Sequence, residues 1–479
     1  MDKNLKLQTL VLHFLNSRLT LPIKPSTPLP NSLMAENRVS MPYTGHLVLF
    51  SYPYQGHINP MIQLARTLHS RGFFITIVHT DYNAPHLEPS PGFSIESICL
   101  GLSNQEAREM DKVELVLVLN EKCRHPFRAL MEDLQSRKGG VPVSCLITDA
   151  VMYFTQDLAE ELGIKRMAFR TSSSTSTLGF QAIREKGYLD ERADTSDELV
   201  PDLSPIRFKD LPFVKTKYPD YFSLFISSFT SKSFRASALI FNTSDSLESP
   251  ALEKIRPQCR GPVYAIGPLN LPSSSSILLE DDKCISWLDT QPPRSVVYTS
   301  FGSIAGLDSS QVMEIAWGLA NSGRPFLWVV RSDLVNGLNT AGLPSGFMDQ
   351  VGSCGLVVEW APQKKVLAHR AVGAFWTHCG WNSTLESICA GVPMACWPQF
   401  SDQRVNSRLI CHVWGVGAEM RREVERGEVE MVVRRLLERE GEEMRERASE
   451  LKKVVEKSLG KGGSSYDALE SLILQLMSC

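Results

Sequence analysis

The segment Trp360–Gln403 holds the densest group of side chains suited to binding an anionic ligand. Within it, Val372–Thr377 is typical of a buried strand, His378–Trp381 is a glycine-containing loop, and Asn382–Ala390 is typical of a helix. A strand, a short turn and a helix aim the free backbone N–H groups of the helix N-terminus at one point. The helix dipole favours negative charge there as well. This spacing predicts a phosphate site.

The side chains around this predicted anion site could bind the rest of a nucleotide-like ligand. Glu386 lies four residues after Asn382, so both project from one helix face, where the carboxylate could accept hydrogen bonds from ribose hydroxyls. Trp360, at the end of its expected strand, offers a flat face to a base. Asp402 and Gln403 follow the next strand and could bind hydroxyls. Individually, these residues could equally be a helix cap, a core aromatic residue or a solvated carboxylate, but their grouping at strand ends favours a binding site.

A second group, early in the chain, could transfer a proton. His57 lies in the expected loop between the first strand and the first helix, and Asp149 closes the expected strand SCLITD. The positive end of the helix disfavours the imidazolium form, so we expect His57 to be neutral and able to accept a proton. If the two residues meet, the carboxylate fixes the imidazole tautomer and stabilises the imidazolium that forms. The alternatives are a structural histidine and an aspartate that caps a helix.

The elements that must position these residues alternate between strands and helices from His46 onward, which is typical of an α/β domain with a mostly parallel sheet. A helix is expected over Met61–Gly72. The first series of expected strands is His46–Tyr52, Phe73–Thr80, Val143–Ala150, Arg166–Thr171 and Ala238–Thr243.

A second series of the same kind follows the Ser-, Pro- and acid-rich segment Pro268–Asp282, which reads as an exposed linker. Its expected strands are Ser295–Ser303, Phe326–Arg331, Gly355–Trp360, Val372–His378 and Pro393–Trp397, and its last helices are Arg426–Glu440, Glu442–Leu459 and Ser464–Met477. Two doubly wound halves are therefore expected. Ligands bind such sheets at the carboxyl ends of the strands, so the cleft between the halves is the expected site.

Composition excludes several classes of protein. The 479 residues include 50 Lys+Arg and 53 Asp+Glu, a net charge of −3, with 43% hydrophobic and 22% charged residues. This near-neutral balance gives no basic footprint for nucleic acid, and the length suits two domains. The 11 cysteines are scattered without a C-x-x-C pair, which favours a reducing compartment and disfavours structural zinc. No apolar run approaches the ~18–20 residues that span a bilayer.

Missing motifs narrow the chemistry further. No G-x-G-x-x-G follows an early strand and no G-x-x-x-x-G-K-[ST] occurs, which argues against a dinucleotide oxidoreductase and a P-loop NTPase. No D-x-D pair and no H-E-x-x-H occurs either, so no metal site is expected.

The segment from Trp360-Ala-Pro-Gln to Asp402-Gln403 closely resembles the signature box of plant UDP-dependent glycosyltransferases. The resemblance extends over the chain after about Gly45. It includes Gln55-Gly-His-Ile-Asn-Pro60, Phe301-Gly-Ser303 and Gly462-Gly-Ser-Ser465. It implies a GT-B fold, in which two Rossmann-like doubly wound domains face each other across a cleft.

The resemblance also implies roles for individual residues. Those implied for uracil and ribose are Trp360, Ala361, Gln363 and Glu386. Those implied for the diphosphate are Ser303, His378, Asn382 and Ser383. Those implied for the sugar are Trp381, Asp402 and Gln403, with Thr171 near it; a final glutamine in the box resembles glucose users. His57 is then the general base and Asp149 its partner.

The domain boundaries expected from these observations are a disordered leader (1–44), an acceptor-binding domain (45–270), a linker (271–285) and a UDP-sugar-binding domain (286–455). The C-terminal helix (456–479) is expected to pack back on the first domain. We expect the acceptor pocket to be lined from around Met110–Leu130 and Phe180–Phe225.

The activity that the resemblance implies is inverting transfer of glucose from UDP-glucose to a hydroxyl, carboxyl or amine of a small apolar acceptor such as a flavonoid, phenolic, terpenoid or hormone. UDP-sugar is then a co-substrate, and no cofactor is expected. The alternatives are a UDP-sugar epimerase or hydrolase on the same fold, and a non-catalytic UDP-sugar-binding protein. The chain is expected to be a cytoplasmic monomer with no nucleic-acid partner.

Overall fold

The computed structural model describes residues 43–85, 87–137, 140–188, 195–269, 283–302, 306–331 and 343–479. Nearly all of the expected leader and most of the expected linker lie outside these ranges. Among the described residues, no helix is long and apolar enough to cross a membrane.

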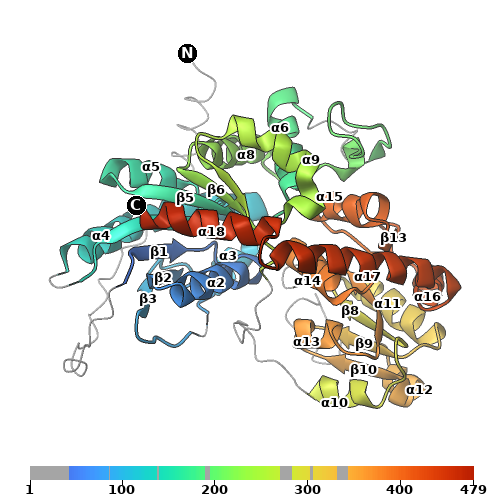
Figure 1. Cartoon of the computed structure of the whole chain (residues 1–479). Helices are drawn as coiled ribbons and strands as arrows, with labels where there is room; N and C mark the ends of the chain where they lie inside the picture. Colours follow the sequence, from blue (N-terminus) through green and yellow to red (C-terminus); the bar gives the residue numbers. More distant parts are fainter. Residues whose placement is uncertain are drawn as a thin grey trace.

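The N-terminal half is built on a seven-stranded parallel sheet with the order β3-β2-β1-β4-β5-β6-β7 (Figure 1). Its strands are β1 (His46–Phe50), β2 (Phe74–Thr80), β3 (Phe93–Ile98), β4 (Val143–Asp149), β5 (Lys165–Arg170), β6 (Ala238–Phe241) and β7 (Val263–Ala265). The strand order reverses direction between β1 and β4, and parallel sheets bind ligands at such a switch point.

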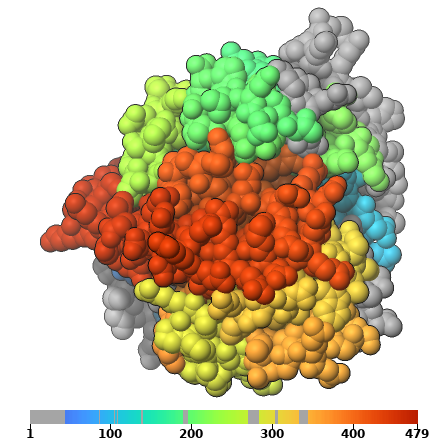
Figure 2. Space-filling model, turned by 90° about the vertical axis from the view of Figure 1, so that its right-hand side faces the viewer, coloured from blue at the N-terminus to red at the C-terminus, as the bar shows by residue number. Residues whose placement is uncertain are grey.

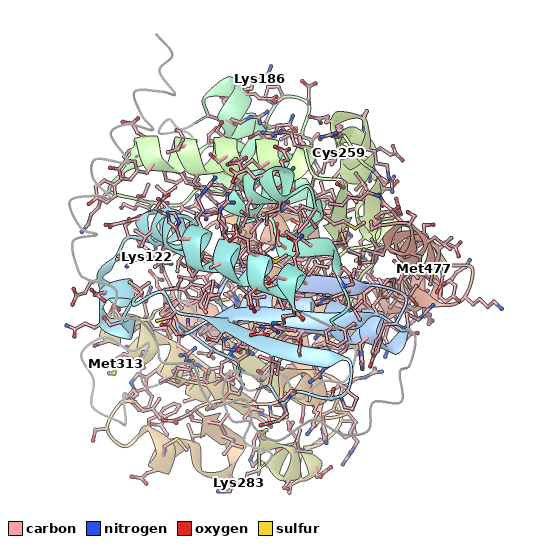
Figure 3. The ribbon with its side chains drawn as sticks, turned by 90° about the vertical axis from the view of Figure 1, so that its left-hand side faces the viewer. Lys122, Lys186, Cys259, Lys283, Met313 and Met477 are labelled. Carbon is pink, nitrogen blue, oxygen red and sulfur yellow. The ribbon has the colours of Figure 1, made fainter. Side chains whose placement is uncertain are left out.

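Helices cover both faces of this sheet, because successive side chains of a strand point to opposite faces. Leu47 and Leu49 of β1 pack in a cluster that includes α2, while Val48 and Phe50 pack in a cluster that includes α4. Figure 3 shows α4, marked by Lys122, lying across one face of the sheet. The helices of this half are α2 (Gln55–Ser70), α3 (Asn104–Glu109), α4 (Lys112–Ser136), α5 (Phe154–Leu162), α6 (Ser174–Lys186), η1 (Phe208–Asp210), α8 (Pro219–Phe234), α9 (Asp245–Ile255) and η2 (Arg256–Gln258).

The C-terminal half repeats this design with a six-stranded parallel sheet, β10-β9-β8-β11-β12-β13, whose switch point lies between β8 and β11. Its strands are β8 (Val296–Ser300), β9 (Phe326–Val329), β10 (Gly355–Val358), β11 (Val372–Thr377), β12 (Met394–Cys396) and β13 (Gly417–Glu419). Its helices are α10 (Lys283–Asp289), α11 (Ser309–Asn321), α12 (Phe347–Val351), η4 (Gly352–Cys354), α13 (Gln363–Leu367), α14 (Trp381–Ala390), α15 (Asp402–Arg408), η5 (Leu409–Val413), α16 (Arg426–Leu437) and α17 (Arg439–Leu459). The two Rossmann-like halves confirm the predicted fold class.

The chain crosses back to the first half at its end. Helix α18 (Ser464–Met477) follows α17 and lies along the N-terminal sheet (Figure 1). Its Leu472, Ile473 and Leu476 are buried in the same cluster as Leu47 of β1. Burying these apolar side chains therefore ties the two halves together.

A second set of contacts joins the halves on the face shown in Figure 2, where orange-red segments of the C-terminal half meet green segments of the N-terminal half. Arg207 pairs with Asp210 at 2.8 Å and with Glu419 of β13 at 3.2 Å. Arg408 donates to the carbonyl of Pro205 at 2.8 Å.

The structure corrects several expected elements. Helix α2 begins at Gln55 rather than at Met61, so His57 lies in its first turn instead of in a loop. The strands β3, β7 and β13 were not expected. The third of the expected C-terminal helices, Ser464–Met477, has the bounds predicted.

Candidate active site

The carboxyl edges of the two sheets face a common cavity of about 910 Å³. His57 follows β1 and Asp149 ends β4, so the pair lies at the switch point of the first sheet. Gly302 follows β8 and His378 follows β11, at the switch point of the second sheet. The fold therefore brings the predicted proton-transfer group and the predicted anion site to opposite walls of one cavity.

His57 and Asp149 are in direct contact. The Nδ1 atom of His57 lies 2.7 Å from Oδ2 of Asp149, and because a carboxylate only accepts, Nδ1 carries the proton and donates. The Thr171 hydroxyl oxygen lies 3.0 Å from the same nitrogen. This arrangement leaves Nε2 of His57, a cavity-lining residue, as the nitrogen that can accept a proton.

The electrostatics of His57 differ from the expectation that the helix end keeps the imidazole neutral. Burial acts to lower the pKa of His57, but the charge and hydrogen bond of Asp149 outweigh it and raise that pKa above its ordinary value. Asp402 adds to the rise, and the nearby Arg170 opposes it. The pair therefore stabilises the imidazolium, which makes His57 a stronger base.

Two buried arginines of β5 lie near Asp149, on its side of the His57–Asp149 pair. Arg166 donates to Thr148 Oγ1 at 2.7 Å and to the Asp149 carbonyl at 3.4 Å, and burial lowers its pKa to about 10. Arg170 packs its guanidinium 3.9 Å from the ring centre of Phe229, and burial lowers its pKa to about 9. Sequence reasoning missed both, although a charged residue in an apolar strand was a signal.

The early start of α2 is explained by a contact from the other half. Pro60 has no N–H, so the carbonyl of Gly56, four residues earlier, loses its partner within the helix. The Asn382 side chain donates to that carbonyl at 2.7 Å. Asn382, expected at the diphosphate, therefore also connects the two walls of the cavity at the helix that carries His57.

The loop between β11 and α14 carries the residues of the predicted anion site. Burial lowers the pKa of His378 to about 4, with a partial offset from the Ser300 backbone, so its imidazole is neutral. Gly302 and Gly380 enclose the ring, because a Cβ on either would lie 2.5 Å from Nε2. Cys379, between His378 and Gly380, adopts a φ of 65°. The loop thus opens onto the N-terminus of α14, where free N–H groups favour an anion.

Three of the residues expected at the donor nucleotide form one network. Gln363 Nε2 donates to Ser383 Oγ at 3.0 Å and to Glu386 Oε2 at 2.8 Å. The Tyr298 hydroxyl donates to Gln363 Oε1 at 3.2 Å. These bonds hold the Glu386 carboxylate on the wall of the cavity, one helical turn after Asn382.

Trp360 lies on the same wall, half-buried, two residues after β10 ends. The Arg331 guanidinium lies 5.8 Å from its ring centre. Ala361 is buried between two lining residues but does not line the cavity itself. Ser303 lies outside the described residues.

The residues expected at the sugar differ in which hydrogen-bonding groups they leave available to a ligand. The Trp381 indole N–H donates to the Asn242 carbonyl at 2.8 Å, so that group is occupied and not available to a ligand. Gln403 Oε1 accepts from the backbone N–H groups of Gln399 (2.8 Å) and Phe400 (3.2 Å), which leaves its amide NH₂ to donate. Burial raises the pKa of Asp402, which lines the cavity next to Gln403.

The part of the cavity nearest the pair is largely apolar. Lining residues come from both of the expected segments and include Val113, Leu115, Val116, Phe180 and Phe225. Lys112, which sequence reasoning did not single out, places Nζ 3.3 Å from the ring centre of Phe400 in the other half. Burial lowers the pKa of Lys112 to about 8.

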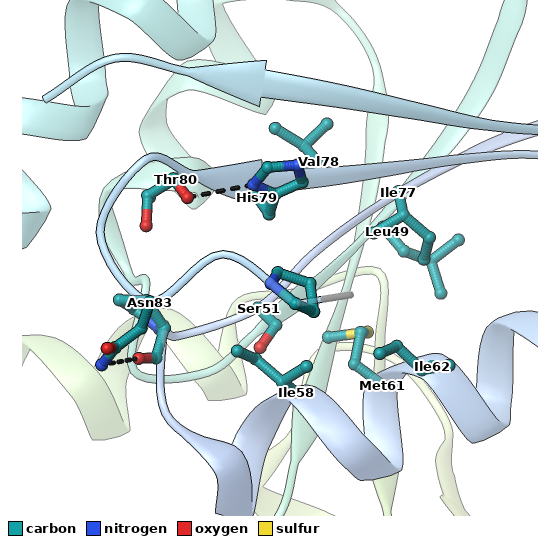
Figure 4. Close-up of a pocket in the computed structure, with 12 residues that line it drawn as sticks. Leu49, Ser51, Ile58, Met61, Ile62, Ile77, Val78, His79, Thr80 and Asn83 are labelled. Carbon is teal, nitrogen blue, oxygen red and sulfur yellow. Dashed lines mark hydrogen bonds between the residues drawn. The ribbon is translucent and has the colours of Figure 1, made fainter. Parts of the chain in front are cut away.

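A second hollow lies beneath α2, between Ile58 and Met61 on the helix and Leu49, Ile77 and Val78 on the sheet (Figure 4). Its volume of about 10 Å³ holds at most about one water molecule. The 910 Å³ cavity is therefore the candidate site.

Comparisons with known proteins agree with this geometry. Residues 282–454 match the family model described as UDP-glucoronosyl and UDP-glucosyl transferase. The chain is 44% identical over 444 residues to UDP-glycosyltransferase 76B1 of Arabidopsis thaliana, covering 90% of this chain and 98% of that protein. It is 38% identical over 470 residues to (R)-mandelonitrile beta-glucosyltransferase of Prunus dulcis, covering 90% and 97%.

Solved structures show the same fold. The chain superposes with a TM-score of 0.77 and 29% identity on Phytolacca americana UGT2 complexed with UDP-2fluoro-glucose and pterostilbene, covering 90% of this chain and 99% of that one. A UDP-glucose: anthocyanidin 3-O-glucosyltransferase in complex with UDP gives a TM-score of 0.80 at 26% identity, covering 91% and 100%. The chain belongs to the plant UDP-glycosyltransferase family and is a UDP-dependent glycosyltransferase of the GT-B fold.

Proposed function

We propose that the protein transfers glucose from UDP-glucose to a nucleophilic group, typically a hydroxyl, of a small apolar acceptor and gives a β-glucoside. The observation that carries the proposal is that the His57–Asp149 pair faces the diphosphate loop His378–Gly380 across one cavity. Several relatives are named as glucosyltransferases of small molecules, which supports the choice of sugar and acceptor class. The apolar lining around Phe180 and Phe225 suits such an acceptor.

The chemistry proceeds in one displacement. Nε2 of His57 takes the proton of the acceptor hydroxyl, and Asp149 stabilises the imidazolium that results. The acceptor oxygen forms a bond to the anomeric carbon as the bond from that carbon to the phosphate oxygen breaks, and UDP leaves with the electron pair. Attack opposite the leaving group inverts the α-linked sugar to β.

The donor wall binds and stabilises UDP. Trp360 stacks on uracil, Glu386 accepts from the ribose hydroxyls, and the N-terminus of α14 faces the diphosphate. The neutral imidazole of His378 donates a hydrogen bond to the diphosphate, where negative charge grows as UDP leaves. Asp402 and the NH₂ of Gln403 bind hydroxyls of the glucose.

The test is to mix the purified protein with UDP-glucose and a panel of small acceptors and to measure UDP release. Release that requires an acceptor, with a glucoside detected by mass spectrometry, supports the proposal. Release without an acceptor indicates a hydrolase, and conversion of the sugar without release indicates an epimerase. Bound UDP-glucose with no turnover on any acceptor indicates a binding protein; each of these three results contradicts the proposal.

A further inference from the structure

One fully buried side chain outside the predicted site connects three parts of it. Asn406 lies on α15, one helical turn after Asp402, and has no exposed surface. Its Nδ2 donates to the Cys379 carbonyl at 3.0 Å and to Asp402 Oδ2 at 3.1 Å. Its Oδ1 accepts from the Ser173 hydroxyl at 2.9 Å. Both partners of Nδ2 are acceptors and the partner of Oδ1 is a donor, so the amide has one orientation.

Each of these three partners belongs to a different functional part of the cavity. Cys379 is the residue of positive φ that separates His378 from Gly380 in the diphosphate loop. Asp402 lines the cavity at the proposed sugar site. Ser173 caps α6, accepting from the Ser176 N–H at 3.2 Å, and lies two residues after Thr171, which contacts His57. Figure 1 shows α15 beside the N-terminal helix α6.

We propose that Asn406 is a positioning residue for glucosyl transfer, which holds the Asp402 carboxylate at the proposed sugar site, steadies the Cys379 turn of the diphosphate loop and ties both to the loop that supports His57. This inference rests on the proposed function. One oxygen of Asp402 is held by Asn406, and the carboxylate lines the cavity, where it can accept from a sugar hydroxyl. The bond to Ser173 crosses between the halves, so it sets the placement of the donor sugar relative to the base.

Two substitutions of Asn406 change its hydrogen bonds in different ways. Asn406→Ala removes all three hydrogen bonds. Asn406→Asp keeps the shape and the acceptor for Ser173, but it places oxygen against the Asp402 carboxylate and the Cys379 carbonyl, which repel it. Asn120 offers a matched control, because it is another buried amide with three hydrogen bonds, to Val116, Val151 and Phe154.

The experiment measures kcat, the KM for UDP-glucose, the Kd for UDP and the melting temperature of each variant. We expect both Asn406 variants to lower kcat/KM for UDP-glucose by ~10–100-fold, since a small misplacement of reacting groups costs up to about 10²-fold. The Kd for UDP, which lacks the sugar, should change less than this, since only the bond to the Cys379 carbonyl concerns the diphosphate loop. Asn120→Ala should lower the melting temperature without this difference between UDP-glucose and UDP.

The outcomes are distinguishable. If the unmodified protein transfers no glucose, the proposed function fails. If it does, and Asn406→Asp keeps the unmodified kcat/KM or loses UDP affinity as much as kcat/KM, the positioning role of Asn406 is wrong. Should both Asn406 variants fail to fold, Ser173→Ala decides, because it removes only the bond between the halves among the three bonds of Asn406. It also removes the cap of α6, whose loss is followed by the melting temperature. A fall in kcat at unchanged KM for UDP-glucose supports the role, and an unchanged kcat overturns it.

Discussion

Replacing Asp149 by asparagine changes the tautomer of His57 without changing the shape of the site. Oδ1 of Asp149 accepts from the Val151 N–H at 2.9 Å, so the amide oxygen of the variant keeps this position. The amide NH₂ then faces Nδ1 of His57 and donates to it. Nδ1 must accept, the proton moves to Nε2, and the nitrogen that faced the acceptor can no longer take a proton.

The size of the effect follows from the charge that is removed. At a separation of about 4 Å and an effective dielectric constant of ~20, a carboxylate stabilises an imidazolium by about 4 kcal/mol. Since ~1.4 kcal/mol is tenfold in rate, we expect kcat to fall by about 10³-fold in Asp149→Asn, and the wrong tautomer adds to this loss.

The assay is UDP release with one alcohol and one phenol as acceptors, together with calorimetric titration of UDP. We expect the loss in kcat to be larger for the alcohol, because the more acidic phenol needs less help from a base. UDP affinity should be unchanged, since Asp149 is buried behind His57 in the N-terminal half and does not line the cavity. Thr171→Val, which keeps the carboxylate, serves as the milder control. Retention of more than about a tenth of kcat with the alcohol in Asp149→Asn would refute the reasoning.

Three further predictions concern other residues of the cavity. Trp360→Ala should raise the KM for UDP-glucose by about 5–150-fold, because stacking on a base is worth ~1–3 kcal/mol; an unchanged KM argues against stacking. Gly380→Ala places a Cβ 2.5 Å from Nε2 of His378 and should weaken UDP binding in a calorimetric titration, whereas Gly427→Ala, with nothing within 4 Å, should not. Arg170→Met removes a positive charge that lowers the pKa of the His57 imidazole, so this pKa should rise. The acid limb of the pH profile of kcat/KM should then move to higher pH, and a limb that stays in place contradicts the effect.

Much of the fold was predictable because strands buried on both faces are continuous apolar runs. The expected strand His46–Tyr52 ends two residues beyond β1 (His46–Phe50). In contrast, β3 has the mixed sequence FSIESI and β13 is the three-residue GAE, so no apolar run marks these two strands. The edge strand β7 is the short run VYA, which was missed. The start of α2 could not be predicted either, because Gly56 and Pro60 are usually helix breakers and the partner of the Gly56 carbonyl comes from Asn382.

The residue types of the candidate site were readable in the sequence, but their contacts were not. The meeting of His57 with Asp149 depends on β1 and β4 being neighbours in the sheet. The hydrogen bond from the Trp381 indole N–H to the Asn242 carbonyl depends on how the two halves pack. Asn406 was missed because its partner Ser173 lies 233 positions away, although its place one turn after Asp402 was a signal.

The most direct test of the central claim is the anomeric configuration of the product. The unmodified protein and the His57→Ala variant would be incubated with UDP-α-glucose and an accepted alcohol, and the anomeric proton of the glucoside would be observed by NMR. The account predicts a β-glucoside from the unmodified protein and a turnover lower by ~10²–10⁴-fold in the variant, with UDP affinity retained. An α-glucoside, or a His57→Ala variant of nearly full activity, would contradict single-displacement transfer with His57 as the base.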